Sequence, residues 1–259
     1  MDLTIPLHYW INKKNFGDEL SKYIVQKISE KKVVYVRKNK HKKLLAIGSL
    51  IDRESAYSDS DIWGSGCLQQ NALTKIKYFP IGRYIKQLFS PKSRVHAVRG
   101  PLSRKLLVDA GFFVPEVYGD PAILTPIFYQ PRSTLSNDIG VILHQTHETP
   151  EAAQIIKRMG LRLISIYREG DNEIEEFIDE VASCRKVFST SLHGVIIAQA
   201  YGVPAQWLRI ANQPIHADEE FKFHDYFLGS NQICQTPWEC KNICVWGLSL
   251  SNRYGMEIA

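Results

Sequence analysis

Three observations predict that this chain is an α/β protein with two Rossmann-like domains that face each other across a cleft. Short apolar segments stop at small residues or proline, stretches with helical spacing of apolar residues lie between them, and an aperiodic segment separates the two halves. Alternating buried strands and helices build parallel sheets from β-α-β units. At 259 residues the chain is long enough for two such domains, each with its own core.

Strands are expected where an apolar run ends in glycine, proline or a small polar residue. Helices are expected where apolar residues recur every three or four positions, as do Ile174, Phe177 and Val181. In chain order the predicted strands cover 43–51, 95–101, 115–124, 138–147, 161–170 and 185–194, and the predicted helices cover 17–31, 100–111 and 172–184.

A boundary between the domains is expected at residues 129–137. This stretch, "YQPRSTLSN", is rich in Pro, Ser and Asn and has no periodicity. The first domain then covers residues 1–133 and the second covers 138–259, with a C-terminal extension at 229–259 that shows no clear period. Ligands of such sheets bind beyond the carboxyl ends of the strands, so the residues that follow each strand are the candidates for a site.

The composition is that of an ordinary globular protein, with 44% hydrophobic and 23% charged residues. No apolar run of about 18 residues predicts a transmembrane helix, and the acidic second residue argues against a secretory signal. The five cysteines match no common zinc spacing. We therefore expect a cytoplasmic protein with reduced thiols and no metal.

The net charge of +5 is distributed unevenly. Nine basic residues and no acidic residue lie between Asp61 and Asp109. They are Lys75, Lys77, Arg83, Lys86, Lys92, Arg94, Arg99, Arg104 and Lys105. Such a block predicts an anionic partner, which could be a phosphate group, a lipid headgroup or nucleic acid. No RNA- or DNA-binding motif accompanies the block, so nucleic acid is not an expected partner.

Two candidates in the first half combine a glycine turn with polar side chains. Asn15 can cap the helix that follows, Gly17 permits a tight turn, and Asp18 falls in the first helical turn. Asp18 either serves the helix dipole or acts as a base for a substrate hydroxyl. In "DIWGSG", Ser65 and Gly66 follow a short strand and let a ligand approach the backbone.

Two further stretches predict anion sites at helix N-termini. In "VRGPLSRK", Arg99 ends a strand just before a helix that starts at Pro101, so its guanidinium and the free N–H groups converge. In "STSLHG", Ser191 or Thr190 can cap an apolar helix, and His193 lies in its first turn. The neighbours Leu192 and Gly194 join this site, and His144 and Lys222 are additional candidates from the same half.

Seven motifs in this order and spacing resemble the polysaccharide pyruvyl transferase family. They are "NFGDELSKYIV", "LLAIGS", "DIWGSG", "VHAVRGP", "VPEVYGDPAILTP", "STSLHGVIIAQAYGVPA" and "FKFHDYF". The chain is most similar to the ketal pyruvate transferases of bacterial exopolysaccharide synthesis, of which the xanthan enzyme is the type. The resemblance covers roughly residues 12–228. It implies a fold like that of GT-B glycosyltransferases.

The resemblance implies a reaction that uses phosphoenolpyruvate as co-substrate, with no other cofactor and no metal. Pyruvate would become a cyclic ketal across two hydroxyls of a sugar, and phosphate would be released. Arg99 would neutralise the phosphate, His193 would be the general acid, and Asp18 would be the base or an anchor for the acceptor. The substrate-binding residues would be Asn15, Gly17, Ser65, Gly66, His144, Ser191, Leu192, Gly194 and Lys222.

The acceptor side is assigned to the first domain and the donor side to the second. Residues 68–94 mix aromatic and basic side chains, as segments on membrane surfaces do. Acceptors in this family tend to be lipid-linked oligosaccharides, so we expect a peripheral contact with the inner face of the cytoplasmic membrane. The alternative function is that of a GT-B-like glycosyltransferase with a nucleotide-sugar donor.

Overall fold

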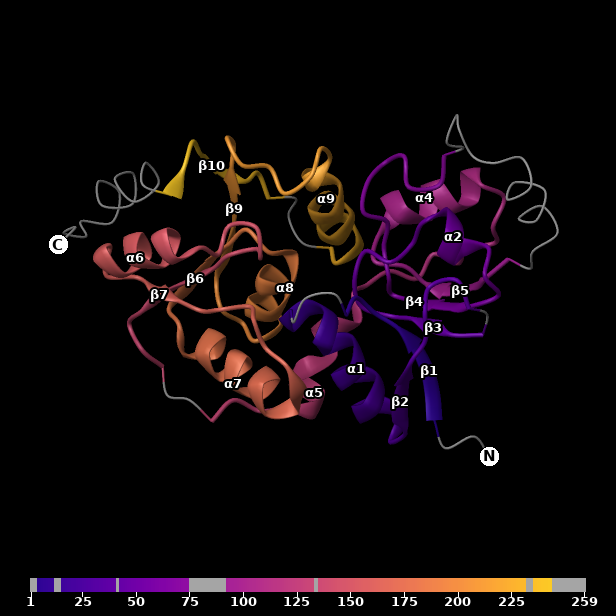
Figure 1. The fold of residues 1–259 in the computed structure, drawn as a ribbon, viewed down its shortest axis with the longest axis horizontal. Helices are drawn as coiled ribbons and strands as arrows, with labels where there is room; N and C mark the ends of the chain where they lie inside the picture. The colour runs from indigo at the N-terminus through magenta and orange to yellow at the C-terminus, as the bar shows by residue number, and fades with distance from the viewer. Residues whose placement is uncertain are drawn as a thin grey trace. The chain divides into compact units, whose positions relative to one another are not determined.

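The fold consists of two compact units, each built around one parallel sheet of five strands (Figure 1). The computed structural model describes residues 4–11, 15–40, 42–74, 92–132, 135–231 and 235–243. The N-terminal unit comprises residues 1–12, 20–121 and 218–234, and the C-terminal unit comprises 13–19, 122–217 and 235–259. Two parallel sheets with helices between their strands confirm the predicted α/β class.

The sheet of the N-terminal unit has the strand order β2-β1-β3-β4-β5, and every described pairing is parallel. Its strands are β1 (Thr4–His8), β2 (Lys32–Tyr35), β3 (Leu44–Leu45), β4 (Asp61–Trp63) and β5 (Arg94–Ala97). Its helices are α1 (Phe16–Ser29), α2 (Arg53–Ala56), α4 (Pro101–Asp109) and α9 (Glu219–Gly229). The first turn of α1 is assigned to the C-terminal unit. Leu45, Ile62 and Leu107 are fully buried in the core between strands and helices.

The sheet of the C-terminal unit has the order β10-β9-β8-β6-β7, and its described pairings are also parallel. Its strands are β6 (Ile139–Ile142), β7 (Arg162–Leu163), β8 (Lys186–Ser189), β9 (Ala205–Ile210) and β10 (Trp238–Cys240). Its helices are α5 (Thr125–Phe128), α6 (Pro150–Arg158), α7 (Gly170–Ser183) and α8 (Leu192–Ala200), preceded by the 3₁₀ turn η1 (Pro121–Leu124).

The periodicity of α7 is confirmed, because Ile174, Phe177 and Val181 are all buried against the sheet. The strand predicted at 115–124 is wrong. Tyr118 makes one isolated bridge with Val98, and the residues from Pro121 form η1. Proline at 121 offers no N–H to a ladder, which prevents that segment from continuing as a strand.

The two units also divide the chain differently from the boundary expected at 129–137, because the change of unit falls between Pro121 and Ala122. The proline-rich stretch is bonded to the C-terminal unit. Tyr201 Oη donates to the carbonyl oxygen of Tyr129 at 2.9 Å, and Tyr129 Oη donates to Asp179 Oδ2 at 2.9 Å. Side-chain partners far away in sequence thus hold a segment whose composition is typical of a linker.

The basic segment 68–94 lies largely outside the described residues, which resume at Lys92. Among the described residues, no helix is both long enough and apolar enough to cross a bilayer.

Candidate functional site

Helix α8 begins where the strand order of the C-terminal sheet reverses. Strands β6 and β8 are neighbours, but the chain continues from β6 to β7 on one side and from β8 to β9 on the other. The loops after β6 and β8 therefore diverge from a common edge of the sheet. In doubly wound sheets, this is the position at which ligands bind.

The first turn of α8 has no side-chain cap. Ser191 occupies the N-cap position, but its side chain accepts no hydrogen bond from the helix, so the hydroxyl cap predicted there is wrong. The hydroxyl of Ser189 accepts from the backbone N–H of Ser191 at 3.0 Å, and Thr190 Oγ1 accepts from the N–H of His144 at 2.8 Å. An N-terminus without a side-chain cap, on a helix that is buried over residues 194–198, favours a bound anion.

Thr190 is also bonded to the ring of a buried histidine, His147. A second contact of that ring shows which of its nitrogens carries a proton. His147 Nε2 lies 2.6 Å from the carbonyl oxygen of Gln213, which can only accept, so Nε2 carries the proton. When the ring is neutral, the Thr190 hydroxyl donates to its Nδ1 at 3.1 Å. The ring centroid of His144 lies 6.3 Å from that of His147 and 6.5 Å from that of His216. No trio of His, Cys, Asp or Glu among the described residues is placed to hold a metal ion.

His193, in the first turn of α8, is packed directly against Gly17. A Cβ atom at position 17 would lie 2.2 Å from His193 Nδ1 and 2.9 Å from its Cγ. Real Cβ atoms do not approach other atoms so closely. Gly17 is therefore required for its lack of a side chain, and it brings the backbone of the 15–19 segment against the imidazole.

The 15–19 segment is fastened to the C-terminal unit by its own first residues. Asn15 Oδ1 accepts from the N–H of Gly17 at 3.0 Å, which is the capping role expected for this residue. The N–H of Phe16 donates to the carbonyl oxygen of Ile166 at 2.7 Å, and the Phe16 ring stacks on Phe177 with centroids 3.8 Å apart. Asp18 is thereby carried, half-buried, on the same turn as Gly17.

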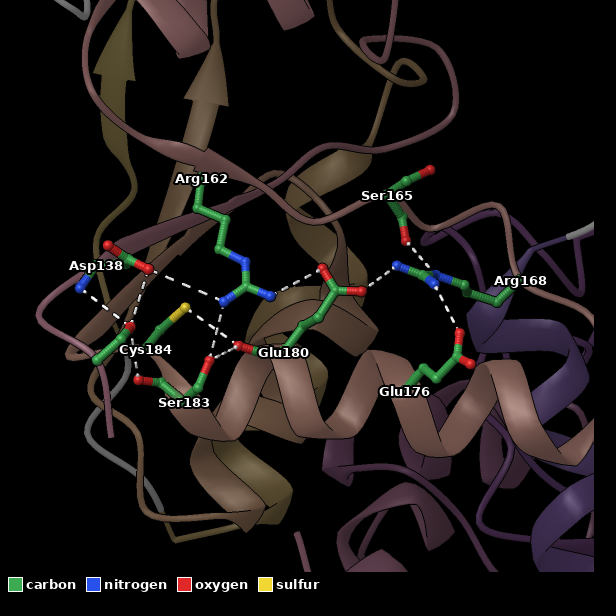
Figure 2. A network of polar contacts seen from close by, with 9 residues as sticks. Asp138, Arg162, Ser165, Arg168, Glu176, Glu180, Ser183 and Cys184 are labelled. Atoms are coloured by element: carbon green, nitrogen blue, oxygen red, sulfur yellow. Dashed lines mark hydrogen bonds and ion pairs between the residues drawn. The ribbon is translucent and has the colours of Figure 1, made fainter. Parts of the chain in front are cut away.

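The loop after β7, which accepts the bond from Phe16, is held to α7 by an arginine. Arg168 Nε donates to the carbonyl oxygen of Ser165 at 3.2 Å, and its Nη2 donates to Glu180 Oε1 at 2.5 Å. Arg162 reaches the same C-terminal turn of α7, where its Nη1 donates to Ser183 Oγ at 3.2 Å. Figure 2 shows both guanidinium groups directed at Glu180 from opposite sides.

In the N-terminal unit, Arg99 is fully buried and already has a carboxylate partner. Its Nε and Nη2 atoms each lie 3.1 Å from Asp225 Oδ2, and Nη2 also donates to the carbonyl oxygen of Cys67 at 2.6 Å. Nη1 donates to Ser49 Oγ at 2.9 Å. This arrangement differs from the phosphate site expected at Arg99, because the side chain of Asp225 occupies the place of the anion.

Helix α9 brings Asp225 to this position by close backbone packing on the turn between β5 and α4. A Cβ atom at Gly100 would lie 1.7 Å from the carbonyl oxygen of Asp225, so only glycine fits there. Asp225 also accepts from Ser103, through the backbone N–H at 2.9 Å and through the hydroxyl at 2.6 Å. Four donor groups therefore compensate the buried carboxylate.

Three further predicted residues surround the Arg99–Asp225 pair or lie on the same helix. A Cβ atom at Gly66 would lie 2.4 Å from Arg99 Cζ, so Gly66 makes room for the guanidinium. Ser65 is buried and donates to the carbonyl oxygen of Gly48 at 2.8 Å. Lys222, on α9, is buried with its ammonium group 5.6 Å from the centre of the Phe223 ring.

The predicted residues thus form two groups, one in each unit. The C-terminal unit holds Asn15, Gly17, Asp18, His144, Ser191, Leu192, His193 and Gly194, and the N-terminal unit holds Ser65, Gly66, Arg99 and Lys222. Asn15, Gly17 and Asp18 belong to the unit opposite to the one in which the sequence places them, and so does Lys222.

Sequence reasoning missed Asp225 as a member of these groups, and it considered Thr190 only as a possible helix cap. An acid among aromatic residues in "FKFHDYF" was the available signal for Asp225, because a fully buried carboxylate is almost always paired. The roles of Thr190 and His147 depend on bonds between different loops, which leave no local pattern.

Comparisons with known proteins place the chain in a family. The sequence profile of the family described as polysaccharide pyruvyl transferase matches residues 10–210, which include both the Arg99 turn and the start of α8. "Uncharacterized protein L143" of Acanthamoeba polyphaga mimivirus is 27% identical over 231 residues, which cover 86% of this chain and 73% of that protein.

Proposed function

Because the chain belongs to the polysaccharide pyruvyl transferase family, we propose that it takes pyruvate from phosphoenolpyruvate and joins it to a sugar as a cyclic ketal. The observation that carries the proposal is the start of α8, where an uncapped helix N-terminus and the imidazole of His193 lie together at the switch point of a parallel sheet. Phosphoenolpyruvate offers a phosphate and a carboxylate to such an N-terminus.

The chemistry requires a general acid near the methylene carbon of phosphoenolpyruvate. Protonation of the methylene carbon makes C2 electrophilic, one sugar hydroxyl adds there, phosphate leaves, and a second hydroxyl closes the ring. Two hydroxyl protons are released in all. One replaces the proton that the methylene carbon gained when it became a methyl group, and the other leaves on the phosphate. His193 is proposed as the general acid, and Asp18 as the base that accepts a hydroxyl proton.

Arg99 receives a different role from the one expected of a leaving-group clamp. With its guanidinium buried and bonded to Asp225, it acts as a positioning residue that fixes α9 and Lys222 on the N-terminal unit. Lys222 then remains a proposed cation for the substrates. A GT-B-like arrangement of the two units is part of the same proposal.

The decisive assay is release of inorganic phosphate from phosphoenolpyruvate in the presence of candidate glycans. His193→Ala is expected to lose at least about 100-fold in rate, as expected for loss of a general acid. His96→Ala is the matched control, because that imidazole is more than half exposed and bonded only to Asp61 in the described contacts. Equal rates for the two variants would refute the role of His193.

Ligand protection separates this function from that of a glycosyltransferase. Phosphoenolpyruvate is expected to raise the thermal unfolding midpoint, whereas a nucleoside diphosphate is not. Protection by the nucleoside diphosphate alone would favour a nucleotide-sugar donor and contradict the proposal.

The acceptor is proposed to be lipid-linked, with the basic segment on the inner face of the cytoplasmic membrane. The acid-free run of positive charges supports this contact, since anionic lipids attract such segments. Reversal to Glu of Lys75, Lys77, Arg83, Lys86 and Lys92 is expected to abolish sedimentation with anionic liposomes. The control reverses five exposed residues elsewhere, Lys27, Lys31, Lys32, Arg37 and Lys40. Equal binding by both variants would refute the contact.

A further inference from the structure

Four loops of the C-terminal unit are linked into a closed circuit around the start of α8. Gly17 packs on His193, and the N–H of its neighbour Phe16 bonds to Ile166. The next residue after Ile166 is Tyr167, whose hydroxyl donates to the carbonyl oxygen of Gln145 at 3.2 Å. Gln145 follows a histidine whose N–H bonds to Thr190, and Thr190 leads back to His193. We call the loops 15–18, 144–147, 165–168 and 190–193 the rim.

The rim contains one exposed aromatic ring. Tyr167 is 43% exposed, although its hydroxyl is bonded and its N–H donates to Ser165 Oγ at 3.2 Å. The residue is therefore held at its backbone and at its hydroxyl, while a large part of it stays exposed. A fixed aromatic face beside polar groups is the usual recognition surface for a ligand with an apolar face and many hydroxyls.

The rim also contains an unused acceptor beside that ring. The Oε1 atom of Gln145 is buried and has no hydrogen-bond partner among the described residues. Leaving a buried polar atom without a partner costs free energy, so a ligand hydroxyl that donates to this atom is favoured on binding. The backbone oxygen of the same residue is the one that holds Tyr167.

We infer that Tyr167 and Gln145 form the subsite for the acceptor sugar, with the Tyr167 ring against the pyranose face and Gln145 Oε1 accepting from a sugar hydroxyl. This inference rests on the proposed function, because the hydroxyls that attack must lie within about 3.5 Å of the donor carbon at His193. The sugar that reacts must therefore contact the rim. The proposed subsite places a contact with the acceptor in the C-terminal unit, whereas the sequence analysis assigns that unit to the donor.

The test compares Tyr167→Ala with Phe113→Ala, which removes another exposed ring, 90% exposed and in the N-terminal unit. Tyr167→Ala is expected to raise the KM for the glycan that supports phosphate release by about tenfold or more, with the KM for phosphoenolpyruvate unchanged. Tyr167→Trp keeps a ring and is expected to recover most of the affinity. An unchanged glycan KM in Tyr167→Ala would overturn the subsite, and so would a parallel rise in both KM values with a lowered thermal midpoint.

A second readout needs no turnover and separates failure of the subsite from failure of the proposed function. Saturation-transfer NMR with methyl glycosides of common aldohexoses is expected to show binding to the wild type and to Phe113→Ala, but at least tenfold weaker binding to Tyr167→Ala and Gln145→Ala. Equal signals in all four proteins would overturn the subsite. Sugar binding that depends on Tyr167, without any phosphate release from phosphoenolpyruvate, would uphold the subsite and refute the donor.

Discussion

Replacement of Gly17 by alanine tests whether the 15–19 segment positions His193. The new Cβ would lie 2.2 Å from Nδ1 and 3.0 Å from Cε1 of the imidazole. Comfortable contacts of this kind begin at about 3.5 Å, so the ring or the helix turn must move by more than about 1 Å. Overpacking of this size costs about 1–3 kcal/mol in the free energy of unfolding.

The same displacement moves the proposed general acid. A misplacement of about 1 Å can reduce a rate by about 100-fold, so Gly17→Ala is expected to release phosphate from phosphoenolpyruvate about 100 times more slowly. Phosphate release is measured at saturating donor, which isolates the loss in kcat from a loss of donor affinity.

A double-mutant cycle with His193→Ala distinguishes a local clash from a general defect of the helix turn. Without the imidazole, the new methyl group of Gly17→Ala has no ring to displace. The higher helix propensity of alanine should then stabilise the double variant by up to about 1 kcal/mol relative to His193→Ala alone. Urea denaturation of the four proteins should therefore give a coupling free energy of at least about 1 kcal/mol. Additive effects, or wild-type activity in Gly17→Ala, would refute the reasoning.

Three further predictions concern buried polar groups. In urea denaturation, Asp225→Asn should destabilise the protein by about 3–5 kcal/mol, because it leaves the Arg99 guanidinium buried without its counter-charge. The double variant with Arg99→Met and Asp225→Leu should recover much of that loss, because it removes both charges. No difference in stability between the single and the double variant would contradict the pairing. Thr190→Val should lower kcat, because it removes the hydroxyl that joins the N–H of His144 to the His147 ring. Full activity in phosphate release would show that this bond is dispensable. Burial lowers the pKa of Lys43, which bonds to Ser58 and Ser60, from 10.5 to about 8. Between pH 8 and 10.5 the unfolded chain therefore binds one more proton than the folded chain, and the free energy of unfolding should rise by up to about 3 kcal/mol with pH. Lys43→Met should abolish that rise, and a rise of equal size in the variant would exclude Lys43 as its source.

Local patterns predicted those parts of the fold that depend on local physics. The spacing of Ile174, Phe177 and Val181 predicts α7 because each helical turn repeats the same requirement for burial. "STSLHG" predicts the start of α8 because a polar strand end precedes a continuous apolar run. The expected hydroxyl cap does not form: Ser191 makes no cap bond, and Thr190 bonds instead to the N–H of His144 in another loop, a contact that no helix rule takes into account.

Long-range pairings determined the rest. Asp225 meets Arg99 across 126 positions of sequence, and nothing local to "VRGP" distinguishes an arginine that awaits an anion from one that has a partner. Likewise "NFGD" has the properties of an ordinary helix start, and its contact with His193 arises from a fold in which the chain passes between units.

The interleaved chain has a consequence for the order of synthesis. Residues 15–19 leave the ribosome before the strands and loops on which they dock, which come only after residue 122. The last helix of the N-terminal unit is made later still, at residues 218–234. Domains of most proteins complete folding one after another as they are made. Here, the N-terminal unit has no α9 until residues 218–234 have been made, so a translation product interrupted before Lys222 contains no complete N-terminal group of site residues.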